Sequence, residues 1–113
     1  MDLHEAEAII FEETENKEGF LFRFAVGGTF LSENWQRLQQ AIHVYSESLT
    51  DDDVTLDRRT AGNIHYLTQV LTLASEAVQE SGEVDAPLEA AANVLWEYNH
   101  TIFSVPQNRS RSF

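Results

Sequence analysis

The apolar positions between Asp57 and Glu80 recur at intervals of three and four residues. This spacing places them on one face of an α-helix, and a second apolar row runs beside the first. We therefore predict a central helix over about residues 57–80, covered by the rest of the chain from two sides. The first row consists of Ile64, Leu67, Leu71, Ala74 and Val78, and the second of Tyr66, Val70, Leu73 and Ala77.

Two further helices are predicted, one on each side of the central helix in the sequence. Ser32 is a suitable N-cap residue, and the apolar residues after it keep a helical spacing to about Leu49. Asp85 followed by Pro87 is a helix start signal, and Pro106 ends the pattern that follows. The polar residues 50–54 are predicted to form a loop.

The N-terminal quarter carries a different pattern. Residues 20–26 alternate large apolar side chains with others, as a half-buried β-strand does. Residues 5–13 contain another apolar run, and the polar residues 15–19 between the two runs suit a hairpin loop. The alternation predicts that Phe20, Phe22, Phe24 and Val26 face the helices, while Leu21, Arg23 and Ala25 face outward.

The predicted fold is therefore α+β, with an N-terminal β-hairpin packed on three α-helices. Residues 3–13 are left open between strand and helix, because residues 5–8 are good helix formers. We expect one globular domain over residues 1–106 and a frayed polar tail over residues 107–113. An uncovered edge of the hairpin would allow a homodimer to form by strand addition.

The composition is that of one ordinary soluble domain. The chain has 113 residues, of which 42% are apolar, and it contains no cysteine. Disulfides, thiolate metal sites and a cysteine nucleophile are thereby excluded. The first residues are acidic where a signal peptide is basic, and no apolar run is long enough to span a membrane. We expect a cytoplasmic protein.

Charge is the strongest compositional feature, because 19 acidic residues against 7 Lys and Arg give a formal net charge of -12. Such a chain is repelled by nucleic acid and by anionic membranes, and it attracts basic protein surfaces. We predict no nucleic-acid or membrane partner and a basic protein partner. Acidic residues crowd the predicted hairpin tip and the loop before the central helix, where we place the partner contacts. These residues are Glu12, Glu13, Glu15 and Glu18 at the tip, and Asp51, Asp52, Asp53 and Asp57 at the loop.

No motif for catalysis, cofactor binding or metal binding has the required pattern. Glu97 and His100 have the spacing found in di-iron bundles, but such a site needs two copies of this motif and two more glutamates. The aspartates from Asp51 onward have Leu56 and Gly62 where a calcium-binding EF-hand loop needs glycine and glutamate. We predict no cofactor, no metal and no catalytic residue.

The favoured function is that of a small acidic protein-binding domain. Its size, charge and lack of cysteine fit an inhibitor or immunity protein that neutralises a basic toxin or nuclease. This is an analogy of class, because no motif carries it. The alternatives are a secretion-type chaperone or complex adaptor, and a small enzyme with no recognisable motif.

Overall fold

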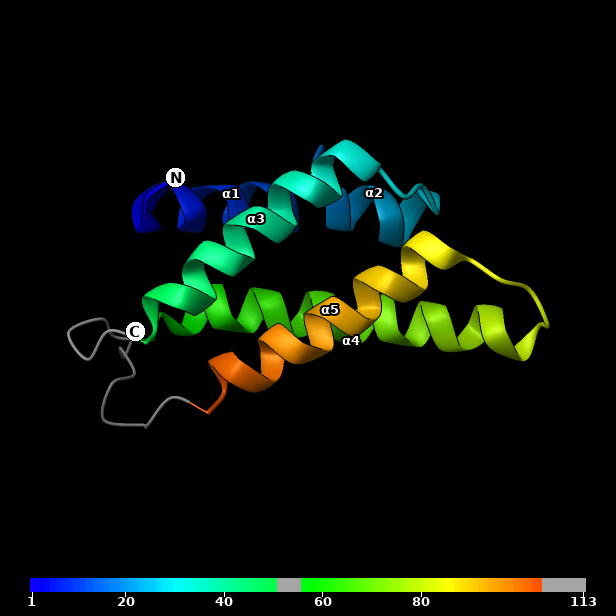
Figure 1. The fold of residues 1–113 in the computed structure, drawn as a ribbon. Coiled ribbons are helices and arrows are strands. Elements are labelled where there is room, and N and C mark those ends of the chain that lie inside the picture. The colour runs from blue at the N-terminus through cyan, green and yellow to red at the C-terminus, as the bar shows by residue number, and fades with distance from the viewer. Residues whose placement is uncertain (51–55, 105–113) are drawn as a thin grey trace.

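The computed structural model describes residues 1–50 and 56–104, and these residues form five α-helices and no β-strand. Three helices form one layer, and the two others form a second layer beneath it (Figure 1). Helix α5 returns across α4 after a short turn, and α1 packs on both α3 and α4. The helices are α1 Leu3–Glu15, α2 Phe20–Gly27, α3 Ser32–Ser48, α4 Arg58–Glu80 and α5 Ala86–Ile102.

The predicted N-terminal hairpin is wrong, because both of its strands are helices. Asp2 caps α1 by accepting a hydrogen bond from the backbone nitrogen of Glu5 at 2.8 Å. The buried residues of α1 are Ala6, Ile10 and Glu13, spaced by four and three, which is the helical alternative for this segment. The predicted α+β fold class is therefore wrong, and the predicted homodimer through a strand edge has no basis, since the described residues contain no strand.

Helix α2 shows why the alternation was misleading. Its buried residues are Phe20 and Leu21, with Phe24 partly buried against the core, which is a helical spacing. Phe22 is 42% exposed and Val26 is 72% exposed, although the strand prediction placed both inward. In so short an apolar run, periods of two and of 3.6 residues both fit the sequence.

The three predicted helices are present near their predicted bounds. Helix α4 begins after Asp57, whose carboxylate accepts from the backbone nitrogen of Arg59 at 3.1 Å. Asp85 caps α5 in the same way, through Leu88 at 3.1 Å. Helix α3 begins one residue earlier than predicted, with Leu31 as its N-cap. Residues 51–54 of the predicted loop and the whole predicted tail lie outside the described residues.

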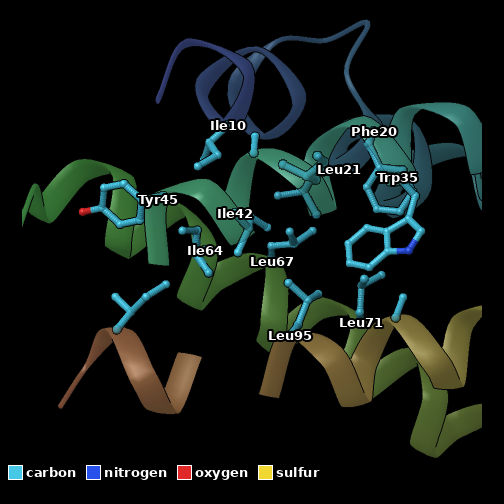
Figure 2. Close-up of a cluster of buried hydrophobic side chains, with 14 of the residues drawn as sticks. Ile10, Phe20, Leu21, Trp35, Ile42, Tyr45, Ile64, Leu67, Leu71 and Leu95 are labelled. Carbon is cyan, nitrogen blue, oxygen red and sulfur yellow. The ribbon is translucent and has the colours of Figure 1, made fainter. Parts of the chain in front are cut away.

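One hydrophobic core joins all five helices (Figure 2). Phe20 is at the centre of an aromatic group with Trp35 and Phe30, at ring-centroid distances of 5.7 and 5.3 Å. The first apolar row of α4 faces this core, and Ile64, Leu67 and Leu71 are fully buried. The second row is covered only in part, because Val70 packs against the core whereas Tyr66 and Leu73 remain mostly exposed.

Candidate functional site

Glu13 was predicted to be a partner contact at a hairpin tip, but it lies inside the α1–α2–α3 layer with 2% of its surface exposed. One carboxylate oxygen accepts from the backbone nitrogen of Phe20 at 3.1 Å, and both accept from the amide of Asn34. Phe20 opens α2, whose N-cap Gly19 has no side chain to offer. Glu13 therefore supplies both the acceptor and the negative charge that favour a helix N-terminus.

Arg37 of α3 joins Glu13 to its neighbour Glu12. The guanidinium lies 3.3 Å from Glu13 and 3.1 Å from Glu12. The hydrogen bond to the Glu12 carboxylate is the main cause that raises the pKa of Arg37 above its usual value. Two of the predicted partner contacts are thus brought together, but around a cation of their own chain.

Glu15 is held at the junction of α1 and α4. Arg59 donates to both of its carboxylate oxygens at 2.8 and 2.9 Å, and the amide of Asn63 donates at 2.6 Å. The hydrogen bond from Arg59 is the main cause that lowers the pKa of Glu15 below its usual value. The guanidinium of Arg59 also lies 4.4 Å from the centroid of the Phe11 ring, a cation–π contact.

The remaining predicted contacts are divided between two places. Glu18 pairs with Arg23 at 2.6 Å on the exposed surface, and Asp57 is the N-cap of α4. Asp51, Asp52 and Asp53 lie outside the described residues. Each predicted contact that the structure describes therefore already binds a group of its own chain.

A surface that the sequence interpretation missed lies between α4 and α5. A hollow of about 460 Å³ opens there, with mostly apolar walls. Leu73 at 66% exposure and Trp96 at 64% exposure are among its lining residues. Its lining is His65, Thr68, Gln69, Thr72, Leu73, Trp96 and Asn99. Two signals of this site were present in the sequence: the second apolar row of the central helix, and a stretch from residue 60 to residue 108 without Lys or Arg.

Two histidines, His43 of α3 and His65 of α4, each contact a side chain of α5. His43 of α3 lies 3.0 Å from the hydroxyl of Tyr98, and His65 of α4 lies 3.2 Å from the side-chain oxygen of Asn99. Burial is the main cause that raises the pKa of Tyr98, with the charges of two glutamates adding to it. Within residues 1–50 and 56–104, no three His, Asp or Glu side chains are grouped to hold a metal ion.

No protein-family model, curated protein or solved structure matches this chain. Within the described ranges, no helix combines the length and the apolar content needed to cross a membrane. The functional argument therefore depends on the surface of the molecule itself.

Proposed function

We propose that this chain is a protein-binding domain with a basic protein partner, as an inhibitor or immunity protein that neutralises a basic toxin or nuclease would be. The observation that carries the proposal is where the charges are balanced. In the α1–α2–α3 layer and at the start of α4, arginines meet carboxylates at 2.6 to 3.3 Å. From residue 60 onward, the described part of the α4–α5 pair has no such balance.

The imbalance can be followed along the sequence. From residue 60 to residue 108 there is no Lys or Arg, while this stretch contains six acidic residues. No ion pair joins these six carboxylates to a cation of the described residues. They are Glu76, Glu80, Glu83, Asp85, Glu89 and Glu97.

A one-signed surface of this kind steers an oppositely charged protein toward itself. The attraction acts over about 8 Å at physiological salt and raises the association rate more than it raises the affinity. Residues 51–53 add three carboxylates in sequence, and in this proposal they contribute to the same attraction. The paired glutamates of α1 contribute less, because nearby arginines offset their charge.

A secretion-type chaperone or complex adaptor is the second candidate, and the apolar hollow beside Trp96 favours it. A chaperone binds an unfolded segment of its partner along such a surface, whereas an inhibitor binds a folded protein. The two candidates differ in the state of the partner and agree on its charge.

The test begins with cross-linking in the native cell and mass spectrometry to identify the partner, followed by stopped-flow binding at several salt concentrations. We expect a basic partner whose association rate falls steeply with salt. The triple variant D51N/D52N/D53N and the triple variant E76Q/E80Q/E89Q are each expected to lower that rate and to flatten the salt dependence. A partner that is acidic, or an association rate that salt leaves unchanged, would refute the proposal.

A further inference from the structure

We infer that the groove between α4 and α5, centred on Trp96, docks an amphipathic helix of the partner, with its apolar face on Trp96 and Leu73 and its basic residues over Glu76 and Glu89. This inference rests on the proposed function, because it takes the partner to be basic. It adds the binding surface and the form of the bound segment.

Three hollows that share Trp96 as a lining residue make up this groove. Residues of both α4 and α5 line two of them, and residues 96–104 alone line the third. Their volumes are about 380, 460 and 260 Å³. On α5 they extend from Glu89 to Phe103, which at 1.5 Å per residue is about 21 Å. That length corresponds to about four turns of a bound helix.

The groove exposes apolar side chains to water, and burying them would be favourable. Trp96 and Leu73 are both about two-thirds exposed, and Phe103 at one end is 51% exposed. Tryptophan is the residue type most enriched among those that dominate binding energy, and it does so from the centre of an interface. The position of Trp96 in the lining of all three hollows matches that role.

Acidic side chains line only one end of the groove, and this determines the orientation in which a basic segment binds. Glu76 and Glu89 line the end hollow where α4 ends and α5 begins. The opposite hollow is lined by His100 and Phe103 and contains no carboxylate. A segment with Lys or Arg at one end and apolar residues toward the other matches this order.

An unpaired hydroxyl lies in the wall of the groove. Thr72 lines two of the hollows, and its Oγ1 is buried with no hydrogen-bond partner in the described structure. One turn earlier, the hydroxyl of Thr68 donates to the carbonyl of Ile64 at 2.7 Å. A buried polar atom without a partner is unfavourable, so rotation of Thr72 toward a bound polar side chain would relieve that cost.

The shape of the site favours a helix over an extended segment. Trp96 and Tyr98 lie on opposite sides of α5, and Tyr98 faces α3 through His43. The Trp96 side of the α4–α5 pair is thus open to one more helix. An extended segment would leave its backbone groups unpaired against mostly apolar walls, whereas a helix satisfies them internally.

The probe is a synthetic helical peptide of about 18 residues, with leucines on one face and lysines on the other, titrated into the full chain by fluorescence anisotropy. Two control peptides have the same leucines with glutamates in place of lysines, or the same composition in an order that is not amphipathic. We expect binding of the first peptide only.

Matched variants test the location of the bound peptide. Trp96→Ala is expected to weaken binding about tenfold or more, and Leu73→Ser several-fold. Val26→Ser is the control for Leu73→Ser, because Val26 is a similarly exposed aliphatic residue on α2. For charge, E76Q/E89Q is expected to weaken binding, whereas E5Q/E33Q removes the same charge from the other layer and is expected to have a smaller effect. Circular dichroism checks that each variant remains folded.

The possible failures are distinguishable. Salt-sensitive binding of the basic peptide that Trp96→Ala and Leu73→Ser leave unchanged would overturn the groove and keep the proposed function. Binding that depends on Trp96 but not on salt or on lysine would overturn the basic partner. Sedimentation showing a dimer of this chain that Trp96→Ala dissociates would assign the groove to a second copy, and would overturn the inference.

Discussion

Glu13→Ala tests the internal role that the structure gives to a residue which the sequence had marked as a partner contact. The substitution leaves the buried backbone nitrogen of Phe20 without its acceptor, which costs about 1–3 kcal/mol. It also removes one buried methylene group, the Cγ, at about 0.8 kcal/mol. The contacts to Asn34 and Arg37 are lost as well, but these side chains can form hydrogen bonds with water instead. We expect a total loss of roughly 2–4 kcal/mol in the free energy of unfolding.

The measurement is urea unfolding at neutral pH, followed by far-ultraviolet circular dichroism. A shift of the midpoint with an unchanged slope isolates a change in stability from a change in the compactness of the unfolded chain. Glu13→Gln keeps the volume and one acceptor, so its expected loss is smaller, about 1–3 kcal/mol. Glu12→Gln is the matched control, because Glu12 pairs with the same Arg37 on the exposed surface. Its expected loss is below about 1 kcal/mol.

A loss below about 1 kcal/mol for Glu13→Ala would refute this reasoning. It would mean that Glu13 is reached by water and that α2 does not need its carboxylate. Equal losses for Glu12→Gln and Glu13→Ala would also contradict it, since burial is the property that distinguishes the two residues.

Three further changes test the core, the helix contacts and the ion pairs. Leu71→Ala should lower the free energy of unfolding by about 2–5 kcal/mol in the same urea assay, because Leu71 is fully buried; a loss below about 1 kcal/mol would show that α4 is rotated. Gly19→Ala should lower the free energy of unfolding by at least about 1–3 kcal/mol, because the added Cβ would lie 2.9 Å from the Cα of Glu13. Gly62→Ala should raise it by about 1 kcal/mol, because the added Cβ would lie in open space. Equal effects of the two substitutions would disprove the close approach of α1 and Gly19. The lowered pKa of Glu15 means that folding favours its ionised form. The difference in free energy of unfolding between the wild type and Glu15→Gln should therefore be present at neutral pH, and should shrink as the pH falls through and below the usual pKa of 4.5. A difference that does not change with pH would contradict this.

The sequence predicted the helices whose apolar spacing continues over several turns. Asp85 caps α5 as predicted, and the fully buried residues Ile64, Leu67 and Leu71 of α4 belong to the predicted first row. The short N-terminal runs gave no such constraint. In α2, Phe20 and Phe24 satisfy both a period of two and a period of four, and the position that decides between them, Leu21, is buried only in the helix.

The candidate site could be predicted only in part, because the sequence shows how many charges there are and not which of them meet. Glu15 and Arg59 are 44 positions apart, and Glu12 and Arg37 are 25 positions apart, so no local pattern indicates that they pair. The sequence also does not show which of two apolar rows on a helix is buried. The row that contains Leu73 has the same spacing as the buried row, and only the packing of α1 and α5 decides which of the two is covered.

The charge distribution and the open row of α4 support one another as features of a binding surface. An exposed apolar patch is a liability for a soluble protein unless its surroundings prevent self-association. Carboxylates such as Glu76 and Glu89 beside the groove do this, because two copies that met through Trp96 would bring like charges together. In the proposed function, the same carboxylates attract a basic segment of the partner to the apolar surface. If the proposal holds, this groove discriminates against a second copy of the chain and for a basic partner, so one set of residues provides both the attraction and the specificity.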